Sequence, residues 1–448
     1  MNEKMIKNTL FLMAIICFFT VNILSAQEKI DENALFSNSE TVVESADIVN
    51  NKEILLQGEE KKSVGISGEL TNVASYTGTR DWLNNGDKKN NVLSTYILGN
   101  LLFDARLKKG TKGFSNIESQ YDAQTGKTDF TLKELFLDFN IKNSIYFRTG
   151  KQVLQWGRCY LWNPVDLINV EKKIFLQKIG YRDGAYGIKL HIPFGTKFNI
   201  YGFFDTGSVL NIDEVGAAGK IEFLLGGTEM AVSAWGKKGF TPVFGYDFSS
   251  RISGVDIYGE ASASYGDNYD KVKLENGFLI KERRQNEWFP KASFGFGRAI
   301  DFADVNDRIN ITGELYYNSA GYSENIFNDI TIYQYMMQSN NGSWAAVNTT
   351  KKEFLLMQNL YEANNFSRYY AALFTSFSKF MISDMIFKLN LISNIEQKSF
   401  TLTTGVNYED MNDFSFGFNI YSYLGDLNSE YTFSGNALTL LFTVGMVF

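Results

Sequence analysis

The sequence predicts an all-β protein, a transmembrane antiparallel up-and-down β-barrel of about 18 strands. Three observations predict it: apolar residues alternate with small or polar ones from Ser63 onward, the composition suits long strands, and the final strand alternates to a terminal Phe448. The 448 residues are 15% aromatic and include 38 glycines but only 4 prolines. Proline cannot donate to a strand ladder, so its scarcity favours long strands.

The first 26 residues are typical of a secretory signal peptide. Lys4 and Lys7 precede an apolar run from Leu10 to Leu24, and Ser25-Ala26-Gln27 offers a small-residue cleavage site. The run is too short to span a bilayer as a helix. We therefore expect residues 1–26 to be removed. The chain's formal net charge of −7 would become −8, because Glu3, Lys4 and Lys7 sum to +1.

Residues 27–62 are polar and charged and show only weak periodicity. We interpret them as a periplasmic N-terminal segment that precedes the barrel of residues 63–448. A plug inside the barrel is the alternative.

Alternation along the chain defines the strands. Phe414, Phe416, Phe418 and Ile420, for example, are separated by smaller or polar residues, as a strand with one lipid face and one wet face requires. The alternation is weak over residues 206–253, so about 16 strands is the alternative count. The predicted segments are 63–77, 92–107, 113–123, 130–140, 144–154, 182–192, 196–205, 218–225, 227–236, 243–249, 252–265, 288–300, 307–318, 368–379, 384–394, 398–409, 413–425 and 436–448.

Long and short connections mostly alternate between these segments, as in bacterial outer-membrane barrels with both termini in the periplasm. The long ones would be extracellular, the longest being 319–367, and the short one at 395–397 is an exception. Barrels of about 16 to 18 strands leave an aqueous channel. The strand count therefore predicts a pore.

The last strand also indicates the compartment. Phe448, Met446, Val444, Phe442 and Leu440 form one apolar face. This strand resembles the C-terminal strand of bacterial outer-membrane barrels, which the insertion machinery recognises. The resemblance implies that the protein lies in the cell outer membrane, contacts its lipid and reaches the insertion machinery through Phe448.

Residues 150–169 form the most distinctive motif. The stretch reads Gly-Lys-Gln, then Trp-Gly, then an aromatic residue before Asn-Pro-Val-Asp. It resembles a porin-like family of Gram-negative outer-membrane barrels, many of them uncharacterised. The resemblance implies the fold and the site of action, but no solute. Porin-like barrels are often trimers, so a homotrimer is the assembly it implies. The matching residues are Gly150, Lys151, Gln152, Trp156, Gly157, Tyr160, Trp162, Asn163, Pro164 and Asp166.

This motif enters a long loop whose residues have fixed chemistry. Asn-Pro-Val-Asp predicts a turn, the indole N–H groups of Trp156 and Trp162 need partners, and Arg158 can stack or pair with a carboxylate. One interpretation is a loop that braces the barrel wall. The other is a constriction at which Arg158, Tyr160 and Asp166 meet permeant solutes. Both stay open at this stage, as does the reactivity of the lone thiol of Cys159.

The inner face should be polar and mildly acidic, which favours cations weakly. Glu134, Asp138 and Arg148 lie on adjoining strands and can also simply pair with one another. The acidic inward candidates are Glu69, Asp104, Glu118, Glu134, Asp138, Glu222, Asp256, Glu260 and Glu314, and the basic ones are Arg106, Arg148, Lys189, Lys220 and Lys388.

The leading functional hypothesis is a porin-like channel for passive diffusion of small polar solutes, narrowed by inward-folded loops. The alternative is a surface-exposed adhesin or binding protein that uses the long loops on a plugged barrel. An enzyme is not expected, because His191 is the single histidine and no nucleophile motif accompanies it. No cofactor or metal is expected either. The negative net charge argues against nucleic acid as a partner.

Overall fold

The computed structural model describes residues 63–448, apart from 86–89, 108–109, 167, 169–183, 196, 208, 339–341 and 410–412. The chain divides into two compact units, Met1–Lys52 and Glu53–Phe448, and every described residue belongs to the second. The predicted signal peptide and the segment 27–62 lie outside the described residues. No helix within the described residues is long and apolar enough to cross a membrane.

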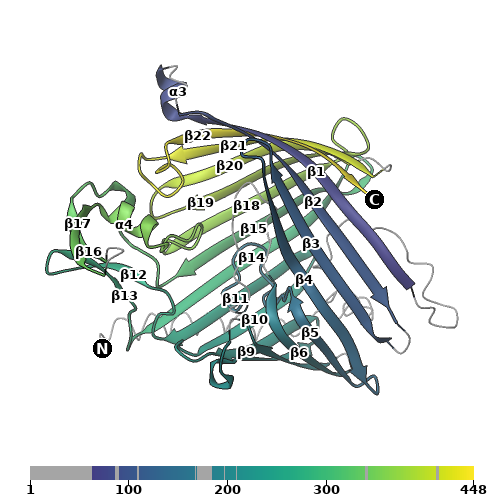
Figure 1. Cartoon of the computed structure of the whole chain (residues 1–448). Helices are drawn as coiled ribbons and strands as arrows, with labels where there is room; N and C mark the ends of the chain where they lie inside the picture. Colours follow the sequence, from purple (N-terminus) through teal and green to yellow (C-terminus); the bar gives the residue numbers. More distant parts are fainter. Residues whose placement is uncertain are drawn as a thin grey trace. The chain divides into compact units, whose positions relative to one another are not determined.

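An 18-stranded antiparallel sheet closes into a barrel, so the predicted fold class is confirmed (Figure 1). Each strand pairs with the next, and the last strand pairs back with the first from Glu69↔Val447 to Thr79↔Asn436. The strands are β1 (Ser63–Thr79), β2 (Val92–Arg106), β3 (Lys112–Asp122), β4 (Lys127–Ile141), β5 (Ile145–Gln152), β6 (Ala185–Phe194), β7 (Phe198–Asp205), β8 (Gly216–Leu225), β9 (Thr228–Gly236), β10 (Val243–Ile252), β11 (Val255–Tyr265), β14 (Trp288–Phe302), β15 (Val305–Asn318), β18 (Tyr369–Ser378), β19 (Met385–Asn394), β20 (Ser399–Glu409), β21 (Phe414–Gly425) and β22 (Asn436–Val447).

The alternative of about 16 strands is wrong, because the weakly alternating region, residues 206–253, contains three complete strands, β8 to β10. Small residues occupy the outward positions there: Ala217 pairs with Gly236, and Gly219 pairs with Ala234. These residues keep the strand period of two but supply little apolar contrast, which is why the pattern is faint in the sequence.

Connections differ between the two ends of the barrel, which we name the short-turn end and the long-loop end. Both described termini of the barrel lie at the short-turn end, where Ala303 and Asp304 adopt φ of 51° and 59° between β14 and β15. Two consecutive left-handed residues form the type I′ turn that matches strand twist. At the long-loop end two connections are nonetheless tight. One is residues 395–398, where a short connection was predicted at 395–397. The other is residues 123–126, which is shorter than the predicted 124–129 because β4 begins at Lys127.

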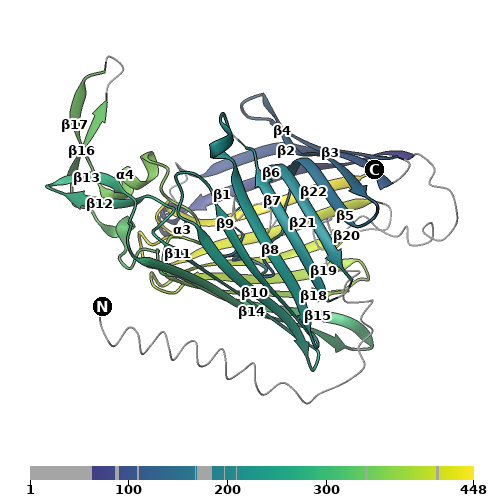
Figure 2. The ribbon, with the colours of Figure 1, turned by 90° about the horizontal axis from the view of Figure 1, so that it is seen from below.

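The connections between β11 and β14 and between β15 and β18 fold into ordered structure beyond the long-loop end (Figures 1 and 2). They build a second, four-stranded sheet, which the sequence analysis treated only as loops. Leu279, Tyr335 and Phe354 form part of its buried core. These elements are β12 (Lys271–Glu275), β13 (Phe278–Glu282), η3 (Ile326–Asn328), β16 (Tyr333–Gln338), β17 (Trp344–Thr349) and α4 (Lys351–Met357), with α3 (Arg80–Asn85) and η2 (Ile212–Glu214) in other connections.

Candidate functional site

A loop folded against the inner face of the barrel forms the candidate site. We call residues 153–166, which follow β5, the inward loop. Its start is fixed at the wall: the buried Gln152 donates from Nε2 to the carbonyl oxygens of Arg148 (3.2 Å) and Gly187 (3.3 Å). The backbone N–H of Val153 donates to Glu134 (2.9 Å). Glu134, one of the predicted inner-wall residues, therefore anchors the loop.

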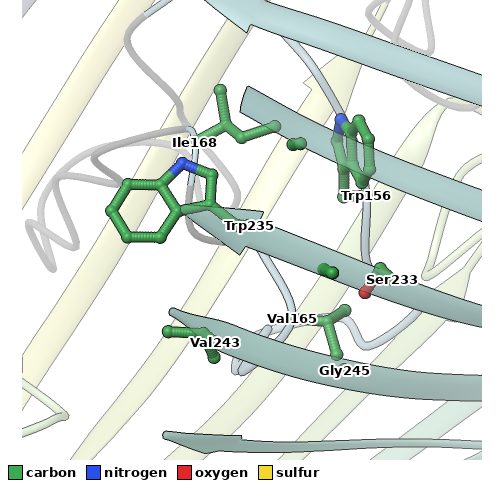
Figure 3. A pocket seen from close by; sticks show the side chains of 9 residues that line it. Trp156, Val165, Ile168, Ser233, Trp235, Val243 and Gly245 are labelled. Carbon is green, nitrogen blue, oxygen red and sulfur yellow. The ribbon is translucent and has the colours of Figure 1, made fainter. Parts of the chain in front are cut away.

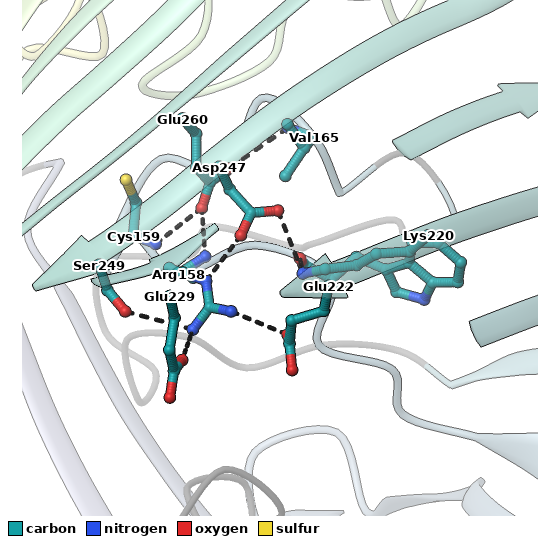
Figure 4. A network of polar contacts seen from close by, with 10 residues as sticks. Arg158, Cys159, Val165, Lys220, Glu222, Glu229, Asp247, Ser249 and Glu260 are labelled. Atoms are coloured by element: carbon teal, nitrogen blue, oxygen red, sulfur yellow. Dashed lines mark hydrogen bonds and ion pairs between the residues drawn. The ribbon is translucent and has the colours of Figure 1, made fainter. Parts of the chain in front are cut away.

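Arg158 lies at the centre of a buried ionic cluster (Figure 4). Its guanidinium donates to Asp247 (2.6 Å), Glu222 (2.8 Å) and Glu229, which come from three consecutive strands. Lys220 completes the cluster through Asp247 (3.1 Å) and donates to the carbonyl oxygen of Trp156 (2.6 Å). Charge-assisted bonds in a partly desolvated site are stronger than surface pairs, so this cluster fixes the loop to β8–β10.

Two buried carboxylates from the wall bind the backbone of the inward loop. Glu260 on β11 accepts the N–H groups of Arg158, Cys159 (2.7 Å) and Val165 (3.3 Å). A loop whose successive N–H groups converge forms an anion-binding concavity. The loop is therefore held by its main chain.

Glu314 on β15 holds the next three residues of the loop in the same way. Its carboxylate accepts the N–H groups of Tyr160 (2.8 Å), Leu161 (3.1 Å) and Trp162 (2.6 Å). Because β11 and β15 are separated by β14 in the barrel, the two carboxylates spread the attachment over a width of three strands.

Gly157 is needed for this attachment. A Cβ atom at this position would lie 2.7 Å from the Glu260 carboxyl carbon and 2.6 Å from the Asn163 side-chain oxygen. Real Cβ atoms do not approach other atoms this closely. The Trp-Gly pair of the motif therefore lets the loop backbone reach the carboxylate.

Trp162 packs against β15 and β18. Its ring stacks on Tyr316 with centroids 5.5 Å apart and lies 5.8 Å from Tyr370. Its indole N–H donates to the carbonyl oxygen of Asn364 (2.7 Å). The predicted need for an indole partner is thus met by the connection before β18, and the buried ring joins the loop to that connection.

Trp156 packs against β8–β10 (Figure 3). With Val165, Trp235 and Val243 it encloses a cavity of about 10 Å³, which is no larger than one water molecule needs. The inward loop is therefore closely packed against this part of the wall.

The remaining motif residues differ in exposure. Tyr160 is 48% exposed, and its ring packs edge-on against that of Phe374 with the ring centroids 4.9 Å apart. The N–H of Asp166 donates to the carbonyl oxygen of Asn163 (3.1 Å), which gives the predicted turn.

Cys159 is a buried free cysteine, and burial together with Glu260 and Glu314 raises the pKa of its thiol. A thiol is reactive as its thiolate, so this environment disfavours reactivity.

Of the other predicted lumen residues, four form ion pairs along the wall of β2–β5: Asp104, Arg106, Asp138 and Arg148. Asp138 and Arg148 are direct cross-strand partners and pair bidentately at 2.7 and 2.9 Å. Asp104 contacts Arg106 (3.4 Å). Lys189 is the cross-strand partner of Arg148 on the same inner face.

Sequence reasoning missed two acids that matter to the site, Glu229 and Asp247. Asp247 lies in the region of weak alternation, but on its own strand it alternates with Phe244, Tyr246 and Phe248, which face outward. That local signal was sufficient to place Asp247 inward. With it, the formal charges of Arg158 and Lys220 oppose those of Glu222, Glu229 and Asp247, so the ionic cluster has a net formal charge of −1. No group of three or more residues suited to metal binding occurs among the described residues.

No protein-family model matches this sequence, and no curated protein matches it. Solved structures do resemble the fold. OccK8 (OprE) of Pseudomonas aeruginosa superposes with a TM-score of 0.51 at 7% sequence identity, covering 86% of this chain and 98% of that chain. OccK9 (OpdG) of the same organism gives a TM-score of 0.50 at 7% identity, with coverage of 86% and 98%. Both are OprD/Occ-type outer-membrane porins, and identity this low indicates a shared fold rather than a shared solute.

Proposed function

We propose that the protein is an outer-membrane channel through which small polar solutes diffuse passively, narrowed by the inward loop. The observation that carries the proposal is the combination of a closed 18-strand barrel with a charged inner wall and a loop fixed across part of it. Barrels of this strand number are wide enough to leave an aqueous path. No covalent chemistry is required, because diffusion needs only a wet, shaped lumen.

The inward loop would act both as a brace and as a constriction. Its backbone is held by Glu260 and Glu314, whereas the ring of Tyr160 remains exposed. Around Arg158 the ionic cluster has a net formal charge of −1, so cations should be favoured over anions in the narrow part. A solute would meet the Tyr160 ring and the exposed parts of the Glu222 and Glu229 carboxylates.

Three further assignments accompany this proposal. Phe448 would present the barrel to the insertion machinery, the apolar outer face would contact outer-membrane lipid, and the assembly would be a homotrimer. Phe448 exchanges both backbone hydrogen bonds with Gly68, at 2.8 and 2.9 Å, so the same residue also completes closure of the barrel.

Single-channel recording of the purified barrel in planar bilayers, across a KCl gradient, tests the function. Stable conductance steps with a cation-selective reversal potential are expected. A folded, heat-modifiable barrel that conducts nothing would overturn the channel, and an anion-selective reversal potential would contradict the charge argument alone.

Surface binding is the second candidate function. The observation that favours it is the ordered four-stranded sheet beyond the long-loop end, since functional residues are often carried on loops that a rigid scaffold positions.

A further inference from the structure

The β16–β17 hairpin presents an uncharged face to solvent. Its cross-strand pairs are Gln334↔Asn348, Met336↔Ala346 and Gln338↔Trp344. All six side chains are exposed, with Trp344 at 62% and Met336 at 47%. Paired residues lie on the same side of a sheet. An indole ring, a thioether and three carboxamides thus form one continuous surface, which we call the amide face.

The opposite side of the hairpin is anchored in the extramembrane core. Tyr335 is buried, with its ring 5.5 Å from that of Phe354 on α4, and Leu279 packs beside them. Helix α4 begins in a capping box formed by Thr350 and Glu353. The amide face is therefore displayed on a packed support, which reduces the entropy that a ligand would lose by ordering it.

The hairpin is unusual in having no charge. From Ile330 to Thr350 the sequence contains no Asp, Glu, Lys or Arg, although 21% of the whole chain is charged. Strand β17 is also the edge of its sheet. Exposed edge strands are commonly protected from association by charged residues. Because the hairpin has no charged residues, we infer that its surface binds a ligand.

We propose that the amide face binds a neutral glycan. Each carboxamide offers both donors and an acceptor, as a polyhydroxyl ligand requires, and a Trp ring offers a flat apolar surface with a polar edge. An anionic membrane surface would instead select Lys and Arg. The stretch 330–350 contains neither. The inference deepens the second candidate function and rests on it, but it does not require that the barrel conduct.

The amide face lies outside the barrel, so its contribution can be separated from conduction. Trp344→Ala removes the stacking ring, and Gln338→Ala removes the carboxamide directly opposite. Trp288→Ala is the matched control, because Trp288 is 60% exposed and lies on the barrel wall at the start of β14. Heat modifiability and single-channel conductance should be unchanged in the two hairpin variants.

Affinity electrophoresis of the detergent-solubilised full-length protein tests the proposal, with soluble amylose, dextran, laminarin and xyloglucan as four separate probes. At least one should retard the wild type and the Trp288→Ala control equally. Trp344→Ala should weaken that binding roughly tenfold, the size expected for loss of an aromatic contact, and Gln338→Ala should weaken it less. Equal retardation of wild type and Trp344→Ala, or no retardation by any probe, would overturn the proposal.

Discussion

Replacing Arg158 should release the inward loop from β8–β10. Arg158→Met keeps most of the side chain's length but removes the guanidinium that lies between Asp247, Glu222 and Glu229. Asp247 would keep Lys220 at 3.1 Å, whereas Glu222 and Glu229 would lose the cation between them. Breaking a buried ion pair costs about 3–5 kcal/mol. The balance between attached and released loop should therefore shift roughly 10²- to 10³-fold toward release.

The shift can be measured in two ways. Single-channel recordings should show more current noise than the wild type, because a released loop moves within the conducting path. Limited proteolysis of the folded barrel in detergent should cut within residues 153–166 faster. Adding Glu229→Gln to Arg158→Met should recover part of the loss, since it removes one of the acids left without a partner.

A matched surface pair provides the control. Arg251 also pairs bidentately with an aspartate, Asp256, at 2.7 and 3.0 Å, but the two side chains are 67% and 46% exposed. Exposed pairs contribute about 0–1 kcal/mol, so Arg251→Met should leave noise and proteolysis near wild type. If Arg158→Met behaves like Arg251→Met in both assays, the ionic cluster does not hold the loop and the reasoning fails.

Three further predictions concern other contacts. Gly157→Ala should cost about 1–3 kcal/mol of loop attachment and raise proteolysis, whereas Gly219→Ala, where a Cβ meets nothing within 4 Å, should not. Burial raises the pKa of Glu430, in the β21–β22 connection, from 4.5 to about 7. The folded form of this connection should therefore be most stable below pH 4.5 and lose stability as the pH rises to 7. Hydrogen exchange of the connection should show this trend, and Glu430→Gln should abolish it. Phe448→Ala should lower the heat-modifiable barrel fraction in membranes, and an unchanged fraction would argue against the C-terminal assignment.

The barrel could be predicted from the sequence because its signal is local. Outward apolar residues recur at every second position, and register follows from that period. The count of about 18 strands survived even at β8 and β9, where Ala217, Gly219, Ala234 and Gly236 face outward, because turn signals still separated the strands. Small outward residues weaken the pattern without changing its period.

The extramembrane hairpins were missed although one carried a readable signal. Asn276 and Gly277, between β12 and β13, adopt φ of 51° and 83°, the conformation that an Asn-Gly pair favours in a two-residue hairpin turn. The strands are only five residues each, so their alternation is too short to stand out. Their place in a sheet depends on contacts with β16, which no local pattern encodes.

The inward loop shows the limit of sequence reasoning most clearly. Arg158 and Trp162 could be singled out by residue type, and Glu260 and Glu314 could be placed on the inner face by parity. That these carboxylates would bind loop N–H groups could not be predicted, because the partners lie 95 to 154 residues apart in the chain. The donor of such a bond is a backbone N–H group, so the type of residue that carries it does not indicate the bond.

Attachment through the backbone has a consequence for how such a channel can vary. Glu260 and Glu314 bind N–H groups, which every residue except proline supplies, so most loop side chains are free to change without releasing the loop. Gly157 and Arg158 are exceptions, because any Cβ at position 157 meets Glu260 and the Arg158 guanidinium pairs with acids of β8–β10. The exposed ring of Tyr160 lies on the same loop but is not needed to hold it. In the proposed channel, Tyr160 would thus meet a solute without holding the loop, whereas Glu222 and Glu229 would do both. Solute preference could therefore change at Tyr160 while the loop stays attached.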